Sequence, residues 1–545
     1  MVSTAQQGAS SIPTRSPARA GLVLTTLILA ALVCNVNLSV ANIALSSIGR
    51  SFDADQTQLN LVALGCSLGL AMSVLYLGAI GDRHGRKLML TLGLGLTLPF
   101  SFLAAYATSP TMLIIARILT GVAAGMAYPT TLALITALWS EGPQRTRAIA
   151  LWSSVSGGAA ILGPVIAGAL LEKFWWGSVF LIAVVPAAIA LPLVLWCVPG
   201  KAEESTDPID HLGGVLSVAM VALVVLGVGT IGSPGMSTIA LIMIIVAAAL
   251  IAVFFLWQRR APYPLFTPRY AARRFFWVPA TGGMIVFGAM MGSMFIGQQF
   301  LQNVLSYSTF EAGLAVLPAA VGMIAAAPIS ARLVIRRGAR LTMLVGFGCI
   351  LPGFIVMLLA WREVTAYGWV ALAYLLVGVG AGIALTPASR SLTSSVPATK
   401  AGMASGTTDL ERDLGGSIMQ ALLGSLLTAG YATAMIAQIG SSSEAASVTE
   451  QTRSALQQSY ASAANLAAQN PTYATQIVGA ARESFLTGAN WAYLASIAAV
   501  VIGGVVVALC LPGHKKEIAD LTAYAEADSG TDAVPAQTGS GRESA

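Results

Sequence analysis

Fourteen apolar runs, separated by short polar segments, dominate this sequence. A helix rises about 1.5 Å per residue, so about 20 residues cross the roughly 30 Å hydrocarbon core of a bilayer. Only 10% of the residues are charged, against about 25% in soluble domains. We therefore predict an all-α polytopic membrane protein with 14 transmembrane helices. The predicted spans are approximately 21–45, 59–80, 88–107, 111–138, 148–171, 177–198, 212–232, 236–257, 277–300, 311–334, 341–360, 367–388, 401–428 and 487–511.

Lys and Arg are unevenly distributed between the connections. Alternate connections, together with both chain ends, hold 22 of these residues, and the other connections hold 5. Short loops rich in Lys and Arg stay in the cytoplasm, so we expect both termini to be cytoplasmic. The basic residues form short clusters between spans rather than one soluble face, so we expect no nucleic-acid partner.

The order of the runs predicts two halves of six helices. A faint repeat supports this division, because Gly85 and Gly338 occupy matching positions after the second and the tenth span, although Ile335 stands where the first copy has Asp82. Parallel halves with the substrate between them are a transporter arrangement. The predicted segments are a cytoplasmic tail (1–20), a six-helix bundle (21–198), a two-helix insert (212–257), a second six-helix bundle (277–511) with an external, partly helical loop (431–486), and a disordered cytoplasmic tail (517–545).

Candidate ligands for a metal or a cofactor are scarce. All five cysteines fall within predicted spans, and the three histidines fall at span ends or in loops. We find no nucleophile–base set, metal cluster or phosphate-binding loop attached to a soluble domain. We therefore expect no enzymatic activity, no cofactor and no metal site.

The loop between the second and third spans, LGAIGDRHGRKLML, concentrates charge at a turn. An acid among basic groups at a helix end can lock one conformation and release it in another. Positive-inside charges with one solvated acid are the alternative interpretation. The residues alone favour the second interpretation, and the candidates for an inner gate are Gly78, Asp82, Arg83, Gly85, Arg86 and Lys87.

The fourth span contains Arg117, followed at intervals of four residues by Gly121, Gly125 and Pro129. An arginine in an apolar span costs about 2.5–3.5 kcal/mol on insertion scales, so it should face protein or a water-filled cavity. Two interpretations stay open: Arg117 contacts substrate or assists a proton, or it extends to the outer surface while the glycines pack.

The fifth span is crowded with small residues and a proline, which allow close packing and bend the helix. An ordinary kinked packing helix would look the same. The positions concerned are Gly157, Gly158, Gly163, Pro164 and Gly168.

The thirteenth span begins GMASGTTDLERDLGG. Asp409, Arg412 and Asp413 fall within about 100° of one another on a helix, and Glu411 points elsewhere. Charges that enter a bilayer are costly unless they face a cavity, and such acids can be poised for proton exchange. An ion-paired cytoplasmic helix end is the alternative.

These motifs together resemble those of the major facilitator superfamily, across residues 20–511. The pattern G-x-x-x-D-R-x-G-R-K at 78–87 is similar to its signature loop, R-x-x-x-G at 117–121 to its second signature, and 157–168 to its antiporter signature. The first span, VNLSVANIAL, resembles the first-helix signature of the fourteen-helix drug:proton antiporter branch. That signature begins with an aspartate, whereas this chain has Asn37, followed by Asn42.

The resemblance implies an exporter in the cell inner (plasma) membrane that couples proton entry to expulsion of a lipophilic, often cationic drug. Its implied partners are small-molecule substrates, protons and the lipid bilayer, with a monomer as the working hypothesis. It places Asp82, Arg83 and Arg86 at the inner gate, Arg117 in the cavity, and Asp409 and Asp413 as proton or cation sites tuned by Arg412. Exporting an endogenous metabolite or lipid, or a scaffold role without transport, are the alternatives.

Overall fold

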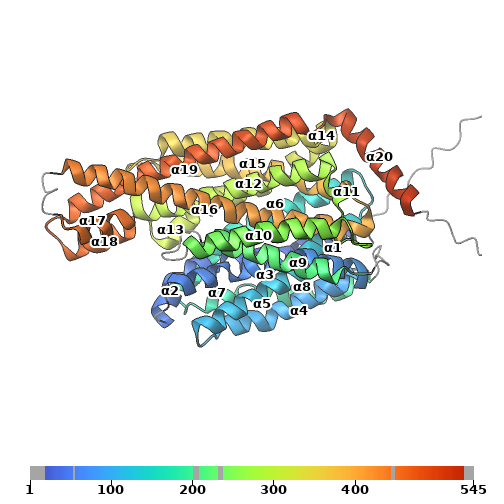
Figure 1. The fold of residues 1–545 in the computed structure, drawn as a ribbon, viewed down its shortest axis with the longest axis horizontal. Helices are drawn as coiled ribbons and strands as arrows, with labels where there is room; N and C mark the ends of the chain where they lie inside the picture. The colour runs from blue at the N-terminus through green and yellow to red at the C-terminus, as the bar shows by residue number, and fades with distance from the viewer. Residues whose placement is uncertain are drawn as a thin grey trace, which may run out of the picture.

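The computed structural model of this chain describes residues 17, 19–52, 54, 56–200, 208–230, 237–442 and 448–532. Within these ranges the ordered elements are helices, and no β-strand is present. Figure 1 shows the long helices running side by side in one common direction. The predicted all-α fold class is confirmed.

The helices form two packed groups. In the first group α5 packs along both α3 and α4, and α1 packs along α6 and α8. This group comprises α1 (Ala20–Ser39), α2 (Ala41–Phe52), α3 (Gln56–His84), α4 (Arg86–Ala105), α5 (Pro110–Leu138), α6 (Pro143–Leu171), α7 (Ser178–Leu181) and α8 (Val184–Cys197).

The second group is built around α14 and α15, while α16 packs against α12 and α19. Its elements are α11 (Pro268–Ala271), α12 (Arg274–Gln299), a π-helical turn (Phe300–Val304), α13 (Thr309–Ala315), α14 (Leu317–Ala360), α15 (Tyr367–Ser394), a 3₁₀ turn (Ala398–Lys400), α16 (Ala401–Ser441), α17 (Glu450–Gln458), α18 (Tyr460–Gln469), α19 (Ala474–Cys510) and α20 (His514–Asp532). Between the groups in sequence come α9 (His211–Thr230) and α10 (Ser237–Gln258), of which α9 packs on α3.

Thirteen helical segments of the described residues are long and apolar enough to cross a membrane. One of them, Phe310–Ala360, is counted once although it contains the 44-residue helix α14. At about 1.5 Å per residue, α14 is more than twice as long as the hydrocarbon core is thick. It is interrupted at Gly338, where φ is 83° and ψ is 175°. The two parts of α14 match the predicted spans 311–334 and 341–360, so the structure is consistent with fourteen crossings.

The two loops that we predict to be repeats share a backbone feature. Gly85, between α3 and α4, has φ 110°, and Gly338, at the interruption of α14, has φ 83°. Residues with a side chain rarely adopt this region, which glycine enters freely. A glycine therefore permits a turn with positive φ in both copies of the repeat.

Contacts between the two groups are made chiefly by six helices. Along the interface α6 packs on α14 and α15, and α16 packs on α3 and α5. Small residues of α6 lie in this interface: a side chain at Gly157 would overlap the methyl group of Met323, and one at Gly158 would lie 3.0 Å from Ile324 Cδ1. The groups therefore meet along closely packed faces.

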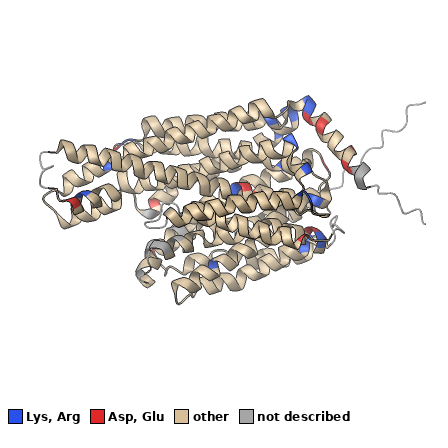
Figure 2. Ribbon diagram, in the orientation of Figure 1, with Lys and Arg blue, Asp and Glu red and all other residues tan. Residues whose placement is uncertain are grey.

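Basic residues gather at one end of the bundle, where α11 and α20 lie (Figure 2). We call this the basic end, defined by segments 83–87, 259–274, 332–340 and 390–400. The helices α17 and α18 lie at the opposite end (Figure 1).

The chain around 431–486 is more regular than a loop. Helix α16 continues to Ser441 and α19 begins at Ala474, so both extend well past the predicted spans, and α17 and α18 lie between them. Tyr431 donates its hydroxyl to the carbonyl oxygen of Leu456 at 3.0 Å, which joins α16 to α17.

The predicted disordered tail is wrong for residues 517–532. Helix α20 extends from His514 to Asp532. Two buried acids attach it to the bundle: Glu517 pairs with Arg390 at 2.9 Å and Asp528 pairs with Arg273 at 2.6 Å. Composition suggests disorder because α20 has few apolar residues, but ion pairs hold it instead. Residues 533–545 lie outside the described part of the chain.

Candidate functional site

Asp82 joins the two helix groups at the basic end. Within its own group, its Oδ1 accepts from Arg86 Nε at 3.0 Å and from Arg86 Nη2 at 2.9 Å. Across the interface, its Oδ2 accepts from the backbone N–H of Gly402 at 2.9 Å, and Arg86 Nη2 donates to the carbonyl oxygen of Ala398 at 2.6 Å. Asp82 is 5% exposed and Arg86 2%, so the ion pair is buried where the two groups meet.

The other residues of the predicted gate have different environments. Gly78 lies against Gly402, because an added Cβ would be 3.1 Å from the Gly402 carbonyl oxygen. Arg83 is exposed. Lys87 donates to the carbonyl oxygen of Leu195 at 2.9 Å, at the end of α8 in its own group. Only part of the loop therefore contacts the second group.

Arg145, which the sequence patterns do not single out, adds another contact across the interface. Its Nη2 donates to the carbonyl oxygen of Thr393 at 3.3 Å, from the first turn of α6 to the last turn of α15. The available signal was a cation shortly after a helix-starting proline, Pro143, which by itself predicts only a cytoplasmic helix end.

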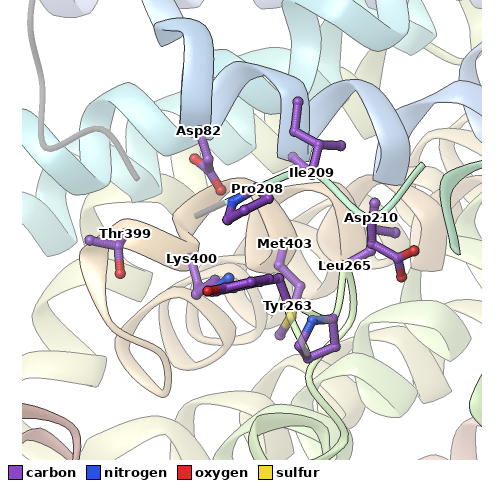
Figure 3. A pocket seen from close by; sticks show the side chains of 11 residues that line it. Asp82, Pro208, Ile209, Asp210, Tyr263, Leu265, Thr399, Lys400 and Met403 are labelled. Atoms are coloured by element: carbon purple, nitrogen blue, oxygen red, sulfur yellow. The ribbon is translucent and has the colours of Figure 1, made fainter. Parts of the chain in front are cut away.

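A small pocket of about 40 Å³ lies beside the gate. Figure 3 shows Asp82 on one side of it and Thr399 and Lys400 on another. Asp210, also at its edge, is fully engaged as the cap of α9: it accepts from Gly213 N–H, Trp257 Nε1 and Gln258 Nε2. Through this pocket the segments flanking α9 and α10 lie next to the gate.

Arg412 occupies the centre of the interface between the groups. Its Nη1 donates to Tyr128 Oη on α5 at 2.7 Å, and its Nη2 donates to Ser389 Oγ on α15 at 3.2 Å. Its guanidinium lies 5.0 Å from the centroid of Trp152 on α6, and this ring stacks on Tyr128 at 5.6 Å. The buried arginine thus contacts both helix groups and an aromatic surface.

Three acids lie within three residues of this arginine in the sequence of α16, and two of them, Asp409 and Asp413, face the interface. Asp409 is 1% exposed, and neither of its carboxyl oxygens has a hydrogen-bond partner among the described residues. Asp413 is half-buried, and its Oδ2 is also unpartnered there. Figure 2 shows acidic and basic residues side by side about midway along the bundle. Burying an unpartnered carboxyl is costly unless it carries a proton or meets a ligand.

Glu411 points away from this cluster. Its carboxyl contacts Gly283 on α12, and Ala388 on α15 lies beside the same glycine. It is 5% exposed, and both of its oxygens lack a hydrogen-bond partner within the described chain. The helix therefore directs one acid into the second group and two towards the interface.

Arg117 donates to backbone carbonyls rather than to the α16 acids with which we grouped it. Its Nη1 donates to the carbonyl oxygen of Asn37 at 2.8 Å, and its guanidinium lies 5.3 Å from the Phe180 ring. It is 0% exposed, so the alternative in which it extends to the outer surface is wrong. None of its hydrogen bonds goes to an acid among the described residues.

Asn37 binds Arg117 through its backbone carbonyl oxygen rather than through its side-chain amide. The Asn37 side chain donates to the carbonyl oxygen of Val33 in its own helix at 3.2 Å. The side chain of Asn42 lies outside the described residues. Further along the predicted antiporter helix, Gly163 packs against Ser39 of α1, and a Cβ added at Gly168 would lie 3.9 Å from the Cα of Phe310. Pro164 lies within α6.

Fold and site together define a class: a polytopic helical membrane protein in which two packed helix groups enclose a buried, charged cluster and contact each other through Asp82 and Arg86 at the basic end. The chain belongs to the Major Facilitator Superfamily, whose family model matches residues 27–213 and 211–420. The predicted resemblance is confirmed. Membership makes the protein a membrane transporter rather than an enzyme.

Curated relatives cover most of the chain. Multidrug efflux pump LfrA of Mycolicibacterium smegmatis is 31% identical over 516 residues, which are 92% of this chain and 99% of LfrA. Methyl viologen resistance protein SmvA of Salmonella typhimurium is 28% identical over 419 residues, covering 76% of this chain and 84% of SmvA.

Among solved structures, the human organic anion transporter MFSD10 superposes with a TM-score of 0.56 at 14% identity. The match covers 89% of this chain and 99% of MFSD10. At this identity the likeness supports the fold alone.

Proposed function

We propose that this protein exports lipophilic cations across the cytoplasmic membrane in exchange for protons, by alternating access between the two helix groups. The unpartnered, buried carboxyl of Asp409 beside Arg412 carries this proposal. A carboxyl in such a place can accept a proton in one state and release it when a cation or Arg412 approaches.

The surroundings of Arg412 suit an aromatic cationic cargo. The Trp152 ring, stacked on Tyr128, already accepts the Arg412 guanidinium at 5.0 Å, and aromatic faces attract organic cations generally. Asp409 and Asp413 add negative charge to the same helix. The names of LfrA and SmvA, a multidrug pump and a methyl viologen resistance protein, agree with such a cargo.

The proposed orientation places the basic end in the cytoplasm, since alternate connections carry 22 of the Lys and Arg residues and the others carry 5. In this orientation the contacts of Asp82 with Gly402 close the cytoplasmic side. Export would require these contacts to break when the protein takes up cargo and to form again before release.

Substrate-dependent proton flux in proteoliposomes tests the proposal. We expect wild-type protein to move protons when a lipophilic cation such as ethidium is added, and Asp409→Asn to lose most of this flux while remaining folded. Glu363→Gln is the matched control, because Glu363 is an exposed acid outside the interface. Equal flux in Asp409→Asn and wild type would remove Asp409 from coupling, and cation export without proton movement would refute proton exchange.

The same assay separates the alternatives. An exporter of an endogenous metabolite or lipid would show proton flux with that compound and none with ethidium. A scaffold without transport would show neither, and Asp82→Asn and Asp409→Asn would leave its function unchanged.

A further inference from the structure

A second polar pocket, of about 400 Å³, lies at the basic end between α20 and the start of α12. Figure 1 shows α11 and α20 at this end of the bundle. Residues from α11 to the first residue of α12 line the pocket together with residues of α20: Arg269, Ala272, Arg273, Arg274, Lys516, Asp520 and Tyr524. Its volume falls within the range of small-molecule binding sites.

The inner wall of this pocket is fixed by Arg273. The guanidinium of Arg273 donates to both carboxyl oxygens of Asp528, at 2.6 and 3.0 Å. Its flat faces lie 4.6 Å from the centroid of Tyr270 and 4.4 Å from that of Tyr524. Asp528 neutralises the charge of Arg273, so Arg273 holds the pocket wall in place. The charge that would bind a ligand comes from the neighbouring basic residues.

The remaining cations of the pocket are uncompensated. Arg269, Arg274 and Lys516 have no ion-pair or hydrogen-bond partner among the residues that the structure describes. Asp520 is the one acid in the lining. Burial and the nearby Asp520 raise the pKa of Tyr524, so its phenol stays protonated and can donate a hydrogen bond. Three cations and a hydroxyl donor match the oxygens of a phosphate group.

The pocket also lies at the level of the membrane surface. Helix α12 enters its apolar span directly from Arg274, and Trp277, one turn further, is 39% exposed. Exposed tryptophans on spanning helices mark the headgroup region. A phosphate that reaches this pocket would therefore have acyl chains beside an available apolar surface.

We propose that this pocket binds the phosphate of an anionic phospholipid in the cytoplasmic leaflet, through Arg269, Arg274 and Lys516. The leaflet assignment rests on the proposed orientation of the protein, whereas the binding site does not require transport. Because α20 supplies Lys516 and Tyr524, a bound headgroup would bridge α20 and α12. A soluble phosphate compound shares the same chemistry, and the experiment distinguishes the two sources.

Native mass spectrometry of the full chain, purified in mixed micelles with phosphatidylglycerol or phosphatidylcholine, tests this site. We expect wild type to retain phosphatidylglycerol selectively. Each basic residue near the surface contributes roughly a fivefold change in affinity, so Arg269→Gln/Arg274→Gln/Lys516→Gln should weaken retention on the order of 100-fold. Arg259→Gln/Arg260→Gln/Arg337→Gln removes the same charge from exposed positions outside the pocket and should retain the lipid.

Three results would overturn the proposal: equal retention in the pocket variant, equal loss in the control variant, or displacement of the lipid by millimolar inorganic phosphate that itself binds in phosphatidylcholine micelles. If the triple variant does not fold, the single charge reversal Lys516→Glu provides the same comparison. Because the measurement counts bound lipid, failure of drug export would leave its outcome unaffected.

Discussion

Replacing Asp82 by asparagine should shift the protein towards the form that is open at the basic end. The carboxylate accepts the Gly402 N–H across the two helix groups at 2.9 Å, and it also holds Arg86 against the Ala398 carbonyl. All these contacts belong to the closed form, so weakening them changes the equilibrium between forms rather than the packing of either group.

The size of this expected shift follows from the weaker hydrogen bond that an asparagine at position 82 would accept from the Gly402 N–H. A bond to a charged acceptor contributes about 1.5–3 kcal/mol and a neutral one about 1 kcal/mol. The substituted amide keeps the shape of the carboxylate but loses its charge, so the closed form should lose about 1–2 kcal/mol. Every 1.4 kcal/mol corresponds to a factor of ten in an equilibrium constant, and the open population should therefore rise about tenfold.

Distances between spin labels at His84→Cys and Thr399→Cys, in a background without native cysteines, measure this population. These positions lie on opposite sides of the gate. Lys87→Gln is the matched control: it removes a charge from the same loop, but Lys87 donates only within its own group, to Leu195. Unchanged distances in Asp82→Asn, or an equal change in Lys87→Gln, would refute the assignment of Asp82 to the gate.

Three further substitutions have expected outcomes. Gly121→Ala would place a methyl group against the Cys66 carbonyl oxygen, so the free energy of unfolding should fall by about 1–3 kcal/mol and the melting temperature should fall with it. Gly95→Ala, with no atom within 4 Å of the added carbon, should not lower the melting temperature. Arg412→Lys keeps the charge but loses the planar group whose two nitrogens donate separately to Tyr128 and Ser389, so cation efflux should fall about tenfold. Arg337→Lys, at an exposed site, should leave efflux unchanged. Glu517→Gln should increase hydrogen exchange in α20, because Glu517 accepts from Ala339 N–H and Arg390, while Asp520→Asn should not.

The general architecture could be predicted because it depends on properties local to each segment. Apolar length predicts a span, and glycine at 85 and 338 predicts the two turns with positive φ. At the start of α13, Ser308 and Glu311 are three residues apart and form a capping box, which is also a local pattern. Asp82 and Arg86 are four residues apart in sequence, and their ion pair spans the turn at Gly85.

Partners distant in sequence could not be predicted. Gly402 is 320 residues from Asp82, and Arg412 is 284 residues from Tyr128. A single sequence gives no geometry for such pairs. The assignment of Arg117 shows the consequence: a buried arginine suggests a cavity with acids, but backbone carbonyls satisfy part of its hydrogen-bonding capacity.

The second loop shows how a missing residue can be replaced from elsewhere in the chain. Ile335 stands where the first loop has Asp82, so the turn at Gly338 has no acid of its own. Glu517 of α20 accepts the N–H of Ala339 at 2.8 Å and pairs with Arg390 at 2.9 Å. Asp82 of the first loop likewise accepts the N–H of Gly402, at the N-terminus of α16, and pairs with Arg86. Asp82 joins the two groups, whereas Glu517 joins elements of one group. The first acid can therefore break its contacts when the groups separate, and the second can remain bound throughout.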